Sequence, residues 1–194
     1  MTIMADDCKI PLSMDFEQFF KEIPSMTINE DVFATVGTAV GKDFHVVTAG
    51  REGHYNSMMG SGGGLGLFFK KPTVWSILRA DRYTLEMIEK EQSYTLSFFP
   101  DEHKEQTLIF GDRSGRDSEK MKEVKLTSVQ TPAGNVAFEE ARLIIECKLQ
   151  AITTIYPDDI CSQEAKDFVR EEYKEKSHYR KVVFGEITHV WVKV

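Results

Sequence analysis

The stretch from His54 to Gly66, HYNSMMGSGGGLG, holds the residues best suited to bind a ligand. Five of the chain's 13 glycines fall in its second half, and glycine lets a backbone turn tightly or approach a ligand closely. We therefore predict a loop here, neither helix nor strand, that borders something flat with polar edges. A solvent-exposed hairpin loop would have the same composition. The candidate binding residues are Asn56, Ser57, Met58, Met59 and Ser61.

Two further segments place cations and hydroxyls where a helix is expected to begin. Residues 82–84 join an arginine, a tyrosine and a threonine at the start of one predicted helix. The first N–H groups of a helix lack intrahelical partners, so such a site favours a phosphate. Residues 111–120, GDRSGRDSEK, open a second helix with similar chemistry, diluted by acidic residues. An ordinary helix cap explains the first segment equally well, and a solvated loop explains the second better than an anion site does. The candidates are Arg82, Tyr83, Thr84, Ser114, Gly115 and Lys120.

Familiar catalytic and nucleotide-binding motifs are missing. A GxGxxG pattern starting at Gly62 fails because its third glycine position holds Leu67, and no GxxxxGK[ST] occurs. The five histidines show no HxH or HExxH spacing, and Ser61 does not lie in a GxSxG elbow. We therefore predict no catalytic side chain and no metal ligand.

Composition and charge exclude several classes of protein. A net charge of −7 argues against a nucleic-acid partner, which selects a basic stripe. No apolar run approaches the roughly 20 residues that span a bilayer, so we expect no membrane partner. The three cysteines lie far apart and form neither a zinc motif nor a disulfide framework. A reducing cytoplasm fits this pattern, and Cys147 is predicted to be a core thiol.

The remaining pattern predicts a mainly β protein. Strands that cluster without regular intervening helices favour a mostly antiparallel barrel over a parallel sheet. Residues 134–152 could be two paired strands or one bent strand, and Gly185 should form a bulge. The other predicted strands are 31–40, 43–50, 71–78, 93–100 and 181–194, and the predicted helices are 15–23, 84–92, 103–110 and 162–176.

Several motifs in a fixed order resemble one known family. The segments VVTAGREGHYNSMMGSGGGLG, RADRYTLEMIEK, YTLSFF and GDRSGRDSEKMKE resemble the flavin reductase-like, FMN-binding split-barrel family, and its flavoredoxin-type members most. The likeness covers most of residues 46–122. It implies a mainly β fold with peripheral helices, a six-stranded antiparallel Greek-key split barrel. We expect one domain over residues 1–194, with 1–30 as an N-terminal extension and 162–176 as a peripheral helix.

The resemblance also implies a cofactor and partners. FMN would bind near the interface of a homodimer, and NAD(P)H would be a possible electron donor for a flavin reductase or a flavoredoxin-like electron transfer protein. A redox partner protein could accept the electrons. The implied FMN contacts are Asn56, Ser57, Met58 and Met59 at the ring, Arg82 and Thr84 at the phosphate, Ser97 and Phe98 beside the flavin, and Ser114, Gly115 and Lys120 in a closing loop.

Two departures from the family pattern matter in the glycine-rich stretch. Relatives commonly read NSMTASWGG where this chain reads NSMMGSGGG. Met59 thus replaces a threonine able to hydrogen-bond the ring, and Gly62 replaces a tryptophan. Two other functions remain open: an electron carrier that holds FMN without NAD(P)H activity, and a non-redox module that binds another phosphate ligand.

Overall fold

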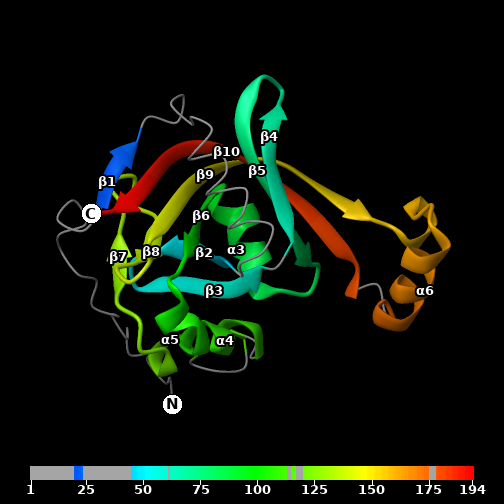
Figure 1. The fold of residues 1–194 in the computed structure, drawn as a ribbon, viewed down its shortest axis with the longest axis horizontal. Coiled ribbons are helices and arrows are strands. Elements are labelled where there is room, and N and C mark those ends of the chain that lie inside the picture. The colour runs from blue at the N-terminus through cyan, green and yellow to red at the C-terminus, as the bar shows by residue number, and fades with distance from the viewer. Residues whose placement is uncertain (1–19, 24–44, 61, 113–114, 117–119, 175–177) are drawn as a thin grey trace, which may run out of the picture.

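An antiparallel sheet curled into a split barrel forms the body of the molecule, with helices around it (Figure 1). The computed structural model describes residues 20–23, 45–60, 62–112, 115–116, 120–174 and 178–194. Within them, the strands of the main sheet are β1 (Phe20–Ile23), β2 (His45–Arg51), β3 (His54–Gly60), β4 (Gly63–Phe68), β5 (Lys71–Arg79), β6 (Ser93–Phe98), β9 (Leu143–Ile155) and β10 (Arg180–Lys193). Their order is β3-β2-β6-β9-β10-β5-β4, with β1 also paired to β10.

The remaining elements lie around this sheet. A separate two-stranded hairpin is made of β7 (Ser128–Gln130) and β8 (Val136–Phe138). The described residues also form the 3₁₀ turns η1 (Asp101–His103) and η2 (Pro157–Asp159). The α-helices in the described part of the chain are α3 (Tyr83–Glu91), α4 (Lys104–Asp112), α5 (Lys120–Glu123) and α6 (Gln163–Glu172). None of these helices has the length and apolarity needed to cross a membrane.

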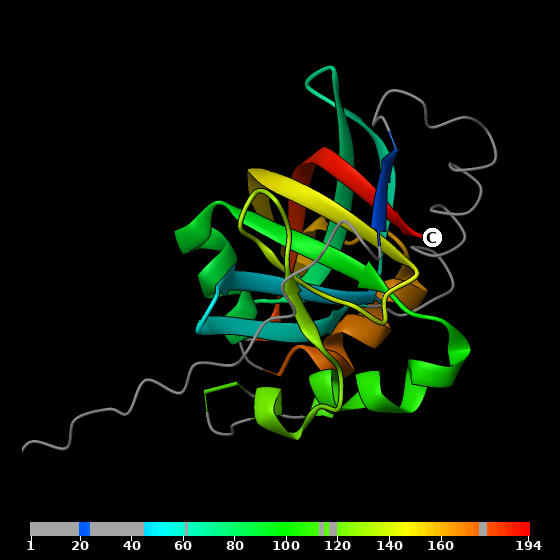
Figure 2. The ribbon, with the colours of Figure 1, turned by 90° about the vertical axis from the view of Figure 1, so that its left-hand side faces the viewer.

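The barrel core follows from the alternation of side chains along its strands. One row of cross-strand partners runs through β2, β6, β9 and β10 as Val47, Leu96, Ile145 and Val190, all buried. Leu85 of α3 joins this cluster. The opposite face of β2 and β3 packs under α4 and α5, so α3 and α4 cover different sides of the same strands (Figure 2).

The glycine-rich stretch is not the loop that the sequence predicted. It forms β3, paired with β2, and β4, paired with β5. The glycines are compatible with a strand here because of what faces them. A Cβ on Gly64 would lie 2.4 Å from Cζ2 of Trp75, and one on Gly66 would lie 3.2 Å from Cζ3. The indole therefore takes the space that β4 side chains would otherwise fill.

This packing predicts that Gly64→Ala lowers the free energy of unfolding by about 2 kcal/mol, as overpacking does in other cores. Gly62→Ala is the matched control, because a Cβ there would make an ordinary 3.6 Å contact with Ile77. Urea unfolding of both variants checks this. A Gly64→Ala protein as stable as the Gly62→Ala protein would contradict the role given to Trp75.

Two predicted elements are wrong and one count differs. Residues 20–23 of the expected helix form strand β1, because Phe20 is buried against Ile144 and Trp191 while the strand pairs with β10. Residues 134–152 form neither two paired strands nor one bent strand. Instead β8 pairs with β7, and β9 lies in the main sheet. The main sheet has eight strands rather than six, and β1, β3 and β4 form where the sequence predicted a helix or a loop.

Other predicted elements are confirmed. Strands occur where 43–50, 71–78, 93–100 and 181–194 predicted them, and Gly185 lies at a register shift between β9 and β10. Cys147 is buried in the core. Helix α6 begins where expected, with Ser162 accepting a hydrogen bond from the N–H of Ala165. It stands apart from the barrel, beyond the ends of β9 and β10 (Figure 1). The predicted strand 31–40 lies outside the described residues.

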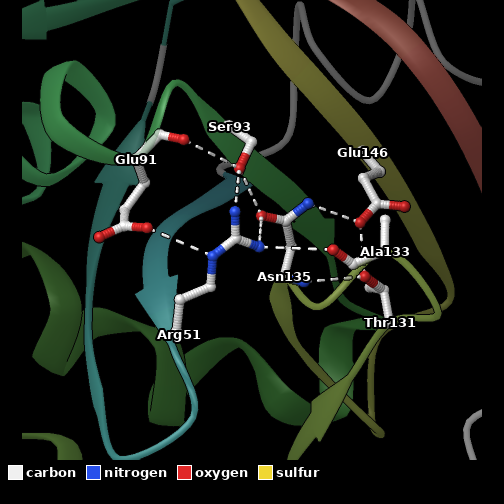
Figure 3. A network of polar contacts seen from close by, with 7 residues as sticks. All are labelled: Arg51, Glu91, Ser93, Thr131, Ala133, Asn135 and Glu146. Atoms are coloured by element: carbon white, nitrogen blue, oxygen red, sulfur yellow. Dashed lines mark hydrogen bonds and ion pairs between the residues drawn. The ribbon is translucent and has the colours of Figure 1, made fainter.

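A polar network ties the β7–β8 hairpin to the barrel (Figure 3). The carboxylate of Glu146, 1% exposed, accepts hydrogen bonds from the hydroxyl of Thr131 and, at 2.7 Å, from the amide of Asn135. The Asn135 oxygen accepts in turn from Nη1 of Arg51 at 3.0 Å and from the Ser93 hydroxyl at 2.7 Å. The network therefore joins β2, β6 and β9 through one buried carboxylate.

Candidate functional site

Three segments that are far apart in the sequence meet at the N-terminus of α3. Nδ2 of Asn56, on β3, donates a 2.8 Å hydrogen bond to the hydroxyl of Thr84, in the first turn of α3. Both side chains are buried. Gly115 packs on the same amide so closely that a Cβ there would lie 2.1 Å from the Asn56 oxygen. The stretch 54–66, the 82–84 segment and the 111–120 segment thus share one site, as the sequence suggested.

Two cations reach this helix end. Arg82 is the N-cap residue of α3, whose side chain makes no capping hydrogen bond. Lys120, at the start of α5, is buried. Burial and then the positive charge of Arg82 lower the pKa of Lys120 to about 8. Burial, with a contribution from the charge of Arg79, also lowers the pKa of Arg82. Like charges gathered at the positive end of a helix dipole create a place that favours an anion.

Tyr83 packs partly buried against the barrel core and is covered by Arg116. The guanidinium of Arg116 lies 5.5 Å from the centre of the Tyr83 ring. Its Nη1 donates to the carbonyl of Asp81 at 2.6 Å, and Nη2 pairs with Glu86. These contacts hold the 115–116 turn against the start of α3. Arg116 thus helps to position Gly115 beside Asn56.

The other predicted site residues with described positions do not join this cluster through their side chains. Met58 and Phe98 lie in the barrel core. The Ser57 hydroxyl lies 2.8 Å from that of Thr48, on the opposite face of the sheet from Asn56. Met59 and Ser97 share that opposite face, in register with Val46. Ser61 and Ser114 lie outside the described residues.

Strand β3 can still offer its backbone at this place. It is the last strand of the sheet on its side, within the residues that the structure describes. Alternate N–H and C=O groups of an edge strand point away from its single partner. A ligand beside β3 would therefore meet main-chain donors and acceptors rather than the buried side chains of Ser57 and Met58.

Among the described residues, the site contains no obvious catalytic or metal-binding group. No cluster of three or more histidine, cysteine, aspartate or glutamate side chains that could hold a metal occurs in that part of the chain. The site's cations at a helix N-terminus favour an anion, and the edge strand beside them offers main-chain groups.

Comparison with solved structures finds the same fold in flavoproteins. An FMN-binding protein from Thermus thermophilus, with bound p-hydroxybenzaldehyde, is 19% identical with a TM-score of 0.59, covering 77% of this chain and 70% of that one. Flavoredoxin of Desulfovibrio vulgaris (Miyazaki F) is 23% identical with a TM-score of 0.55, covering 77% and 68%. An FMN-binding domain of a flavin reductase-like enzyme from Shewanella baltica OS155 is 14% identical with a TM-score of 0.61, covering 89% and 76%.

Sequence comparison identifies the family directly. No curated protein matches the chain. Residues 39–193, however, match the family described as the flavin reductase like domain. That match extends from before β2 to the end of β10 and includes every segment of the α3 site. The chain therefore belongs to the flavin reductase-like domain family.

Proposed function

We propose that this protein binds FMN, with the phosphate at the N-terminus of α3. The observation that carries the proposal is the pair of cations there. Arg82 and the buried Lys120 lie close enough for the charge of one to lower the pKa of the other. Two cations near the N-terminus of a helix, where the helix dipole is positive, favour the binding of an anion. A phosphate monoester supplies that anion, so the donor set fits this cofactor.

The ring of the flavin would then lie along β3. The edge of this strand supplies main-chain groups that can bond the polar rim of a flat ring, in place of the threonine that Met59 replaces. Asn56 is held by Thr84 at the junction between ring and phosphate. We retain as proposed FMN contacts Asn56, Ser57, Met58, Met59, Ser61, Arg82, Tyr83, Thr84, Ser97, Phe98, Ser114, Gly115 and Lys120.

The reaction that fits this site is electron transfer by a flavin. Bound FMN supplies the capacity to take up and release a hydride or electrons. The chain binds the phosphate, orients the ring and presents N–H donors of β3 where negative charge develops. No side-chain acid or base is needed for this role. We propose NAD(P)H as the electron donor and a redox partner protein or a free flavin as the acceptor.

The same proposal extends to the assembly and its location. Large apolar side chains are exposed on the β4–β5 hairpin and on α6, including Leu67, Phe69 and Phe168. These surfaces fit a homodimer.

Cys147 and Cys161 are both free thiols, which suits a reducing cytoplasm. We propose one domain over residues 1–194, to which β1 of the N-terminal extension contributes a strand.

A flavin titration followed by a turnover assay tests the function. Added FMN is expected to change its absorption spectrum on binding, and NADH or NADPH is then expected to be consumed steadily when free flavin is present. Flavin binding without nucleotide consumption would identify an electron carrier instead. Absence of any spectral change on adding FMN would rule out both and leave a non-redox phosphate-binding module.

A further inference from the structure

His45 lies beside the crossover between Gly60 and Gly63, by which the chain passes from β3 at one edge of the sheet to β4 at the other. It begins β2 and is fully buried. Its cross-strand partner is Gly60, the last residue of β3. Gly63, the first residue of β4, pairs with Ser76 of β5. Nε2 of His45 lies 3.3 Å from the Ser76 hydroxyl, so the strand partner of Gly60 contacts the strand partner of Gly63.

The packing around the imidazole is tight. A Cβ on Gly60 would lie 2.4 Å from Nε2 of His45, so only glycine lets β3 end directly against the ring. The imidazole also packs near the ring of Phe98, with centroids 5.5 Å apart. Beyond Gly60, the carbonyl of Gly62 accepts a 2.9 Å hydrogen bond from the N–H of Ile77. Gly60 thus packs against His45, and Gly62 is bonded to β5.

The two ring nitrogens of His45 have few hydrogen-bond partners. Burial lowers the pKa of His45 to about 4, so the imidazole is neutral at pH 7. Nδ1 is buried without a hydrogen-bond partner among the described residues. The contact with Ser76 is therefore the polar contact that orients the ring. A buried imidazole with one unused nitrogen costs stability relative to an apolar ring, which suggests that its placement serves something other than folding.

We propose that His45 is a positioning residue that fixes the end of β3 at Gly60 relative to the start of β4 at Gly63 and, through them, the ring side of the flavin site. The inference rests on the proposed function, because this crossover continues from β3, along which the ring would lie. His45 acts through Gly60 and Ser76 and need not contact the flavin. The phosphate end, at Arg82 and Lys120, is independent of it.

Binding of FMN and riboflavin separates ring effects from phosphate effects, because riboflavin lacks the phosphate. His45→Phe keeps an aromatic ring but loses the bond to Ser76, and it is expected to raise both dissociation constants about tenfold. His45→Gln keeps a polar group near the position of Nε2 and should recover most of both affinities. Arg82→Ala should weaken FMN and leave riboflavin unchanged. Ile145→Val, a small core change on β9, controls for general destabilisation and should alter neither.

Hydrogen exchange of the flavin-free protein provides a readout that does not need a ligand. Peptides covering residues 60–66 should exchange faster in His45→Phe than in wild type, and at the wild-type rate in Ile145→Val. Wild-type affinities and exchange in His45→Phe would overturn the inference, as would equal losses in Ile145→Val. If wild-type protein binds neither flavin, the proposed function fails. Faster exchange at 60–66 would then still establish that His45 positions the crossover.

Discussion

Replacing Lys120 by methionine is expected to raise the dissociation constant for FMN about thirtyfold at pH 7. A hydrogen bond to a charged partner contributes roughly 1.5–3 kcal/mol, and a thirtyfold change corresponds to about 2 kcal/mol. Methionine fills a similar volume in the buried position, so the change removes charge rather than packing. Fluorescence quenching of FMN during titration measures the effect.

The affinity of wild-type protein should also depend on pH in a defined direction. The pKa of Lys120 is about 8, below its ordinary value, so without ligand the ammonium loses its proton as pH rises through 8. A bound phosphate favours the protonated form, and binding above pH 8 must therefore take up a proton. The dissociation constant should rise by up to about tenfold per pH unit above pH 8. Lys120→Met should lose this component of the dependence.

The matched control is Lys122→Met. Lys122 lies on the same short helix but is exposed, and its loss should change the dissociation constant by less than about twofold. Equal effects of the two substitutions would show that only the overall charge matters. A Lys120→Met protein with wild-type affinity for FMN would remove Lys120 from the phosphate site.

Substituting Glu146 by alanine is expected to lower the free energy of unfolding by about 3 kcal/mol. The substitution removes the buried carboxylate to which Thr131 and Asn135 donate hydrogen bonds, and these donors then lack an acceptor. Each unsatisfied buried group costs about 1–3 kcal/mol. The loss also releases Asn135, which accepts from Arg51, so the β7–β8 hairpin should loosen. The melting temperature should fall by about 9 °C for a protein of this size.

Urea and thermal unfolding of Glu146→Ala and Glu171→Ala check this expectation. Glu171 lies on α6 and is exposed, so its loss should change stability by no more than about 0.5 kcal/mol. Equal free energies of unfolding for Glu146→Ala and Glu171→Ala would show that the network of Figure 3 contributes little to stability.

The fold class could be predicted because its signals are local. Alternating apolar residues in 71–78 and 181–194 mark strands whichever partners they take, and the family motifs supply the topology. Local alternation could not predict the strands of the glycine-rich stretch. Its glycines look like loop residues until Trp75, which lies on the neighbouring strand, is seen to fill the space above Gly64 and Gly66. Composition alone cannot show a side chain that another strand provides.

The same limit applies to β1 and to β8. Phe20 fits a short helix by spacing, but β10 and Trp191 turn its segment into a strand. The partner of β8 is β7, a three-residue strand too short to show a pattern. Pairing of this kind is decided by tertiary contacts, which override local preference.

The sequence predicted the part of the candidate site at the N-terminus of α3 better than the part along β3. Helix-start chemistry predicts Thr84 and Gly115 as site residues, and the structure brings both into contact with Asn56. The alternation of β3 sends Ser57 to the opposite face, which a loop assignment could not foresee. His45 carried no motif, since its significance lies in its contact with Ser76.

The most direct test of the phosphate site is a comparison of FMN with riboflavin on the wild-type protein. The two ligands share the ring and ribityl chain and differ only in the phosphate that Arg82 and Lys120 would hold. Fluorescence titration at pH 7 is expected to give a dissociation constant for FMN at least about a hundredfold below that for riboflavin. Equal dissociation constants for the two flavins would contradict a phosphate site at the N-terminus of α3.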